Sequence, residues 1–205
     1  MVDMNGIRLA GRMERLGTES AFEVLARAKA LEAAGKHVIH LEIGEPDFPT
    51  AEHISRAAID ALNAGHTHYV PAPGIPALRE AVAAFLDRTG RLSAPAASPD
   101  RVVVTPGAKP IMFFTIMALA EPGDEVLYPD PGFPMYESIT AFSGATPVPV
   151  PLREANGFRV DVDELAGLIT PRSKLLILNS PHNPCGSALT RGTARRSRNS
   201  RCGTT

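Results

Sequence analysis

The sequence has little of what marks exported or nucleic-acid-binding proteins. Its 205 residues include no tryptophan and only two cysteines, Cys185 and Cys202, and its formal net charge is -1. A balanced charge gives no global attraction to nucleic acid or to an anionic membrane. The first 17 residues lack the apolar core of a signal peptide. We therefore expect a cytoplasmic protein with reduced thiols and no disulfide framework.

Long hydrophobic runs are also missing. The most apolar stretch, residues 111–120, ends at Glu121-Pro122-Gly123. It is about half as long as the ~20 residues that a bilayer-spanning helix needs. The sequence therefore predicts a buried core helix there and no membrane segment.

The composition favours a globular core. Hydrophobic residues make up 44% of the chain and charged residues 21%, so enough apolar surface is available to offset the entropy cost of ordering the backbone. The length suits one domain, or one domain with a fragment of another.

Apolar spacing and helix-ending glycines divide the chain into alternating elements. We expect helices at residues 18–34, 50–64 with Thr50 as the cap, 76–88, 107–120, 133–142 and 162–169. Strands are expected at residues 38–41, 101–104, 125–128, 146–150 and 174–178. Strands that alternate with helices indicate βαβ units and a mainly parallel sheet covered on both faces.

The stretch after Gly186 departs from this pattern. It contains five arginines and no acidic residue, and no large apolar residue follows Leu189. Such a composition cannot build an element that faces a core. We therefore expect residues 191–205 to form an aberrant, disordered tail.

One loop that follows a predicted strand could bind a phosphate. Gly107, Ala108 and Lys109 join a strand to an apolar helix, where free backbone N–H groups and the helix dipole favour an anion. No glycine-rich nucleotide motif accompanies them, so an ordinary strand-to-helix turn is the more common alternative.

Two further loops carry an amide and an aromatic ring. Residues 179–186 present two asparagines on a proline-stiffened loop at a strand's carboxyl end, where open α/β sheets bind ligands, although a simple Asx-Pro turn is the equal alternative. Phe133 could stack on a planar cofactor, but such aromatics more often pack in the core. His66 and His68 lack a matching cysteine or carboxylate cluster, so we expect no metal site.

The order of these loops resembles that of the class I/II aminotransferases of fold type I, which depend on pyridoxal 5'-phosphate. The motifs that carry the resemblance are residues 41–48, Tyr69 with residues 73–80, residues 121–126 and residues 179–186. They lie in family order within roughly residues 17–190. The resemblance implies an α/β fold, with an N-terminal arm and small-domain segment at residues 1–45 and an incomplete cofactor-binding large domain at residues 46–190.

The resemblance also implies roles for residues that would bind the cofactor. Gly107, Ala108 and Lys109 match the phosphate cup, in which backbone amides hold the phosphate of pyridoxal phosphate. Phe133 matches the aromatic that stacks on the pyridine ring, and Asn183 matches the amide that donates to the ring's phenolic oxygen.

Two other matches concern the substrate and the oligomer. Gly44 matches a hinge-loop position close to the substrate carboxylate. Tyr69 matches the tyrosine that reaches the phosphate held by the partner subunit, so the resemblance implies a homodimer.

The segment of the family that carries the Schiff-base lysine has no match in this chain. In the family this lysine lies well beyond the asparagine-proline motif, with an aspartate that pairs with the pyridine nitrogen. The only lysines here are Lys29, Lys36, Lys109 and Lys174, and none lies in a matching context. We therefore assign no catalytic residue, and the resemblance is to the N-terminal half of a family member.

The sequence leaves three alternative functions open. The first is the N-terminal half of an aminotransferase, which in the intact family moves an amino group from an amino acid to a 2-oxo acid, inactive as given. The second is a non-catalytic remnant that keeps the dimerising surface and acts as an interaction module. The third, a Rossmann-like nucleotide binder, lacks the expected glycine fingerprint.

We predict that residues from about Arg191 to Thr205 are read out of frame or are otherwise aberrant. The chain uses 17 arginines against 4 lysines, a bias typical of GC-rich coding, in which a slipped frame yields Arg, Gly, Ala and Thr. Sequencing the DNA beyond the codon of Thr190 should reveal an alternative frame that encodes an amphipathic helix and a downstream lysine motif. The absence of both from the other two frames would show the prediction to be wrong.

Overall fold

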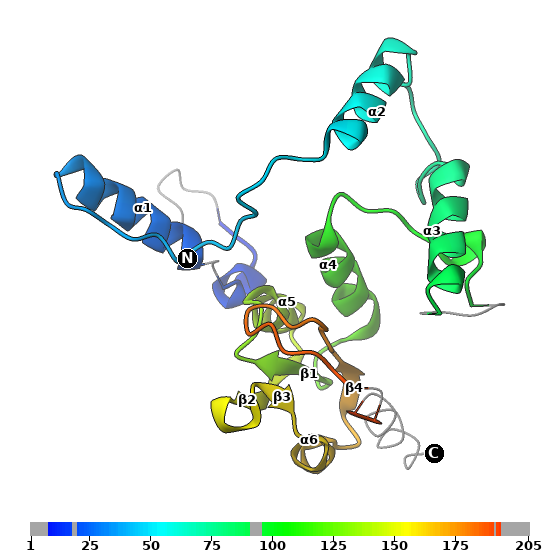
Figure 1. Cartoon of the computed structure of the whole chain (residues 1–205). Helices are drawn as coiled ribbons and strands as arrows, with labels where there is room; N and C mark the ends of the chain where they lie inside the picture. The colour runs from blue at the N-terminus through cyan, green and yellow to red at the C-terminus, as the bar shows by residue number, and fades with distance from the viewer. Residues whose placement is uncertain (1–7, 18–19, 91–95, 191, 194–205) are drawn as a thin grey trace. The chain divides into compact units, whose positions relative to one another are not determined.

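A computed structural model describes residues 8–17, 20–90, 96–190 and 192–193 (Figure 1). The predicted tail at residues 191–205 lies almost wholly outside the described residues. The chain divides into two compact units, which we treat separately. The sheet unit comprises Met1–Glu23 and Lys109–Thr205, and the helical unit comprises Val24–Ala108. Helix α1 (Ser20–Ala33) runs from the first unit into the second.

The sheet unit is built on four strands in the order β3-β2-β1-β4. Strand β1 (Glu125–Asp130) pairs in parallel with β2 (Thr146–Arg153) on one side and with β4 (Ser173–Leu176) on the other. Strand β3 (Arg159–Val160) pairs antiparallel with the end of β2. The expected mainly parallel sheet is confirmed, and β3 is an element that the sequence analysis missed.

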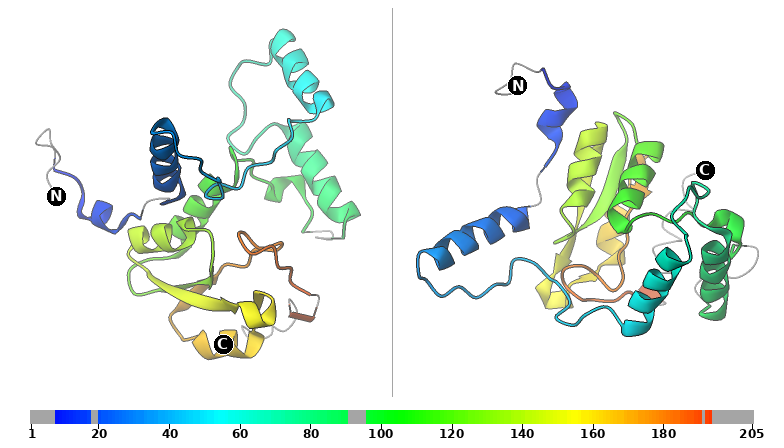
Figure 2. Two further views of the ribbon diagram at one scale, coloured as in Figure 1. Left: turned by 60° about the vertical axis from the view of Figure 1, so that its left-hand side comes forward. Right: turned by 90° about the horizontal axis from the view of Figure 1, so that it is seen from above.

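Helices cover both faces of β1, as expected. Because successive side chains of a strand point to opposite faces, Val126 and Leu127 belong to different core clusters. Val126 packs with residues of α4 (Ala108–Leu119) and α5 (Met135–Ser143), including Ile116 and Ile139. Leu127 packs with Leu165 of α6 (Val162–Leu168). Both layers can be followed in the two views of Figure 2.

The prolines of β2 explain why it pairs so little on its outer side. Thr146 donates its N–H to Asp124 on the β1 side, and N–H direction alternates along a strand. Pro147, Pro149 and Pro151 therefore share the side that faces away from β1. A missing N–H is tolerated there because no ladder with β1 depends on it, so all six residues of β1 pair with β2.

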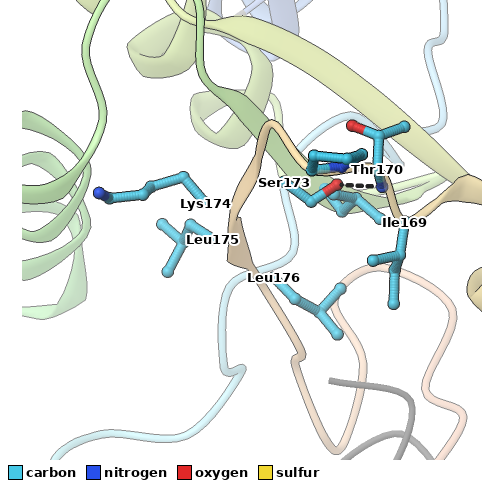
Figure 3. A pocket seen from close by; sticks show the side chains of 8 residues that line it. Ile169, Thr170, Ser173, Lys174, Leu175 and Leu176 are labelled. Atoms are coloured by element: carbon cyan, nitrogen blue, oxygen red, sulfur yellow. Dashed lines mark hydrogen bonds between the residues drawn. The ribbon is translucent and has the colours of Figure 1, made fainter. Parts of the chain in front are cut away.

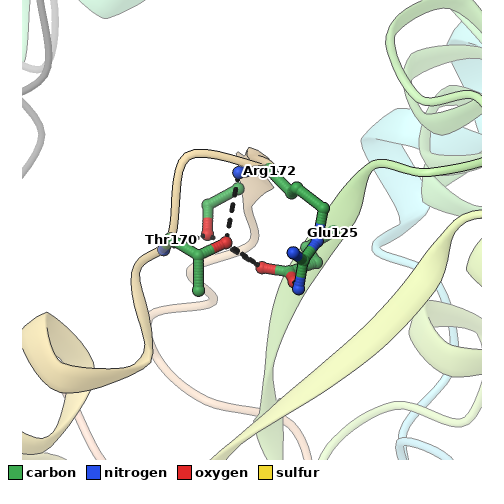
Figure 4. A network of polar contacts seen from close by, with 4 residues as sticks. Glu125, Thr170 and Arg172 are labelled. Carbon is green, nitrogen blue, oxygen red and sulfur yellow. Dashed lines mark hydrogen bonds and ion pairs between the residues drawn. The ribbon is translucent and has the colours of Figure 1, made fainter.

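An ionic network fastens β4 to the first residue of β1 (Figure 4). The buried carboxylate of Glu125 accepts hydrogen bonds from Thr170 Oγ1 and from Arg172 Nη2, each at 2.5 Å. The Thr170 hydrogen bond is the largest of the effects that lower the Glu125 pKa, and the Arg172 hydrogen bond and charge act in the same direction. This carboxylate therefore stabilises the fold above its unfolded-state pKa, and that contribution is lost as the pH falls through the lowered folded-state value.

The N-terminal arm of the sheet unit lies against α5. The 3-10 helix η1 (Gly11–Arg15) places Arg15 Nε 2.9 Å from the Ala141 carbonyl. Gly17 and Ser138 exchange two hydrogen bonds, because the Ser138 hydroxyl accepts from the Gly17 N–H at 3.0 Å and donates to the Gly17 carbonyl at 3.1 Å.

The helical unit contains α2 (Glu52–Asn63), α3 (Pro76–Arg88) and the 3-10 helix η2 (Pro99–Arg101). Arg79 links α3 to η2, since its guanidinium donates to the Pro99 carbonyl at 2.7 Å and to the Val102 carbonyl at 3.1 Å. Gly74 has φ +105°, and a Cβ there would lie 2.8 Å from Val104. This close approach requires glycine.

Two predicted strands are wrong. Residues 38–41 and 101–104 have no strand partner among the residues that the structure describes, and Leu41 and Val103 are exposed. An apolar, β-branched segment becomes a strand only when a neighbour supplies its hydrogen bonds. The predicted Thr50 cap is also wrong, because the cap position of α2 is Ala51, without a side-chain hydrogen bond.

Two hollows lie beside β4, and one of them is mainly apolar. Among the described residues, β4 has a hydrogen-bonded neighbour only on its β1 side. One hollow of about 260 Å³ lies between α4 and the segment 175–178 and is almost wholly apolar. Another of about 210 Å³ is lined by Ile169, Lys174 and Leu176, among others (Figure 3). None of the described helices is both long enough and apolar enough to span a membrane.

We expect the chain to aggregate when it is produced alone, because an open strand edge beside an apolar hollow favours association. Phe114 of α4, whose exposed fraction is 55%, is a suitable site for a test. Phe114→Glu should raise the soluble fraction measured after centrifugation, whereas Ser55→Glu on exposed α2 should not. A monodisperse dimer with a sharp, cooperative thermal transition for the unsubstituted chain would contradict this expectation.

Candidate cofactor site

The loops after β1 and β4 form the centre of the candidate site. Parallel strands have their carboxyl ends at the same edge of a sheet, so the two loops leave the sheet side by side. The backbone of Ile177, just after β4, donates to the Leu127 carbonyl of β1 at 2.8 Å. The chain after β1 then leads to Phe133, and the chain after β4 leads to Asn183.

The Phe133 ring is contacted by an aromatic ring and by a cation. Its ring meets the ring of Tyr136 edge-on, with 5.9 Å between centroids and 83° between planes. The ammonium group of Lys109 lies 5.5 Å from the centroid of the Phe133 ring and 5.9 Å from that of Phe22. The structure thus brings together Lys109 and Phe133, and a cation over an aromatic face is a favourable contact.

The loop that carries Asn183 is closed by its own hydrogen bonds. The backbone N–H of His182 donates to the Ser187 carbonyl, and that of Gly186 donates to the His182 carbonyl, both at 2.7 Å. Ser187 Oγ donates to the Phe158 carbonyl at 2.6 Å. Asn183 is exposed, and its side chain has no hydrogen bond to any residue that the structure describes. Its amide is therefore free to bind a ligand.

The predicted phosphate cup lies at the start of α4. Gly107 has φ +90°, and a Cβ there would meet no atom within 4 Å. The backbone is thus open to an approaching anion, and α4 begins at the next residue, Ala108. Gly107 and Ala108 belong to the helical unit, whereas Lys109 belongs to the sheet unit.

Gly44 and Tyr69 also lie in the helical unit. A Cβ at Gly44 would meet nothing within 4 Å, and Tyr69 is fully exposed. Among the described residues, no three His, Cys, Asp or Glu side chains are grouped to hold a metal ion.

The sequence analysis missed the residues that hold the two loops together. Nε2 of His182 lies 2.7 Å from the Pro131 carbonyl, and the side chain of Asn179 hydrogen-bonds the buried Tyr136. The residues of each pair lie more than 40 positions apart in the chain. A local sequence pattern does not predict a contact between residues so far apart in the chain.

Two tyrosines near the end of β1 have perturbed acidities. Burial, with the negative charges of Glu137 and Asp130 acting in the same direction, raises the pKa of Tyr128 to about 12. Burial also raises the pKa of Tyr136, and the Asn179 hydrogen bond opposes that rise. Both phenols are therefore neutral at ordinary pH.

The sequence model of the family described as Aminotransferase class I and II matches residues 36–196. The chain belongs to this family. It is 43% identical over 174 residues to arginine–pyruvate transaminase AruH of Pseudomonas aeruginosa, covering 85% of this chain and 44% of that protein. It is 40% identical over 179 residues to a probable aspartate/prephenate aminotransferase of Aquifex aeolicus. This match covers 87% of this chain and 45% of that protein.

Solved structures give the same result for the fold. The structure of aspartate aminotransferase from Thermus thermophilus with maleate matches with a TM-score of 0.89 and 34% identity, covering 96% of this chain and 51% of that one. Aspartate aminotransferase from Rhizobium meliloti matches with a TM-score of 0.87 and 36% identity. This match covers 95% of this chain and 48% of that one. The predicted fold class is confirmed, and the chain spans about half the length of these relatives.

We expect Tyr128 to ionise well above the ordinary pH range of a tyrosine. Its folded-state pKa is about 12, above the ordinary value of about 10, so its contribution to stability is complete below pH ~10 and is lost as the pH approaches the folded value. Phenolate absorbance during an alkaline titration measures this. Tyr128→Phe should remove the component of the titration that lies near pH 12, and an unchanged titration of that variant, in a chain that remains folded, would contradict the assignment.

Proposed function

We propose that this chain supplies part of the pyridoxal phosphate site of a homodimeric aminotransferase. The observation that carries the proposal is the meeting of the Phe133 loop and the Asn183 loop at the carboxyl ends of two paired parallel strands, joined by the 2.7 Å contact between His182 and Pro131. Membership of the family supports the same cofactor.

The residues present fit this cofactor. The phosphate would be held by backbone N–H groups at Gly107, Ala108 and Lys109, where glycine leaves the backbone open. The pyridine ring would stack on Phe133, and the free amide of Asn183 would donate to its phenolic oxygen. When bound, the cofactor acts as an electron sink for the substrate's α-carbon.

We assign the remaining contacts from the family. Gly44 would lie near the substrate carboxylate, and exposed Tyr69 would reach the phosphate held by a partner subunit. The substrates would be an amino acid and a 2-oxo acid. In this proposal residues 1–45 belong to the small domain and residues 46–190 to the large domain.

In this proposal neither Lys109 nor Lys174 carries out the proton transfer at the α-carbon. Lys109 lies over the ring of Phe133, where its ammonium contacts the aromatic face. Lys174 is near the start of β4 and lines the hollow beside it, at the opposite end of the strand from the candidate site. We therefore propose that activity requires the half of the family's length that this chain does not match.

We expect weak binding of pyridoxal phosphate and no turnover by this chain alone. A charge-assisted hydrogen bond contributes about 1.5–3 kcal/mol, and the family's partner for the pyridine nitrogen is missing, as is its covalent anchor. The measurements are cofactor titration by absorbance, borohydride reduction with mapping of labelled lysines, and a transamination assay with several amino acids. Borohydride should label several lysines at low yield.

Two phenylalanine variants test whether the cofactor binds at Phe133. Phe133→Ala removes a stacking contact worth about 0.5–1.5 kcal/mol and should weaken binding several-fold, whereas Phe85→Ala on α3 should leave it unchanged. Equal binding by the two variants would contradict the assigned site. Stoichiometric labelling of one lysine, with turnover above the free-cofactor rate, would contradict the claim that the chain is inactive alone.

A further inference from the structure

His182 differs from every other histidine of the chain. Its exposed fraction is 5%, whereas the other five histidines are exposed. Its Nε2 lies 2.7 Å from the Pro131 carbonyl. A carbonyl oxygen can only accept a hydrogen bond, so the proton of the imidazole is on Nε2 and the ring is the donor.

The position of His182 makes this hydrogen bond a bridge between the two loops of the site. His182 directly precedes Asn183, and Pro131 lies two residues before Phe133. The backbone N–H and carbonyl of His182 are themselves fixed by Ser187 and Gly186, each at 2.7 Å. A movement of the imidazole therefore moves the backbone that carries Asn183.

A second contact joins the same two segments. Tyr136 is buried, packs edge-on against the Phe133 ring and hydrogen-bonds Asn179. Asn179 stands at the beginning of the loop that contains His182. The Phe133 segment and the Asn183 segment are thus tied at two points, so the spacing between ring and amide is set by side chains and not by the strands alone.

We propose that His182 is a positioning residue that sets the distance between the stacking face of Phe133 and the amide of Asn183. This inference rests on the proposed function, because it concerns how the chain presents both groups to one planar ligand. A ligand that stacks on the ring and accepts from the amide needs both at fixed spacing, and small misplacements of binding groups weaken recognition strongly. A loop without the bridge would present Asn183 in several positions.

The test compares two amide substitutions that differ by one methylene. In His182→Gln the side-chain amide reaches the position of Nε2 and can still donate to Pro131, whereas in His182→Asn it is too short. Both are made in a Cys202→Ser background, so that Cys185, three residues from His182, is the only thiol. The rate of Cys185 labelling by a thiol reagent then reports opening of the loop, and absorbance titration reports the affinity for pyridoxal phosphate.

We expect His182→Asn to speed Cys185 labelling and to weaken pyridoxal phosphate binding by about 2- to 10-fold, the range for loss of a neutral hydrogen bond. His182→Gln should restore both values. His53→Ala, on exposed α2, is the control and should change neither. Equal behaviour of the Asn and Gln variants would overturn the proposal.

The two readouts separate this inference from the proposed function. Faster labelling of Cys185 in His182→Asn with unchanged cofactor affinity would leave His182 a purely structural role and overturn the positioning role. Failure of the unsubstituted chain to bind pyridoxal phosphate would overturn the proposed function, and with it the role toward the cofactor. In that case the labelling rates would still decide whether the imidazole joins the two loops.

Discussion

The burial of strand β1 between two paired neighbours and two helical layers is the constraint on which the sheet unit depends. Five of its six residues are buried, and the alternation of side chains sends Val126 and Leu127 into different clusters. At its first residue, Glu125 ties β4 to β1 through Thr170 and Arg172. At its other end the chain leaves the sheet for the candidate site. One strand therefore connects the main stabilising contacts with the functional loops.

The geometry of the candidate site follows from parallel pairing and from a few side-chain contacts. Parallel pairing brings the carboxyl ends of β1 and β4 to the same edge, but it does not determine how the loops beyond them meet. How the loops meet is decided by the hydrogen bond from His182 to the Pro131 carbonyl and by the hydrogen bond between Asn179 and Tyr136. His182 and Tyr136 are buried, and each finds a hydrogen-bond partner, which is the condition for keeping a polar group inside a protein. Together the two contacts connect the segment that carries Phe133 to the segment that carries Asn183.

The same requirement for pairing explains what the described chain leaves open. Residues 101–104 have strand-like sequence without a strand neighbour, and β4 presents an apolar hollow of about 260 Å³ beside α4. The chain spans about half the length of the relatives that it matches. Apolar surface of this kind is costly to expose to water, so its presence is in keeping with a fold whose remaining part is not supplied by these residues.

The sequence by itself determined the elements whose hydrogen bonds are local. Helix α3 begins and ends where the apolar spacing predicts, α5 stops at Gly144 in the left-handed conformation, and the family motifs identified Phe133 and Asn183 as site residues, a role that stays a prediction. Tertiary structure decided the rest: which extended segments became strands, the existence of β3, and the bridge from His182 to Pro131. The reason is physical, because a helix satisfies its backbone within four residues, whereas a strand or a buried imidazole needs a partner that only the folded chain brings near.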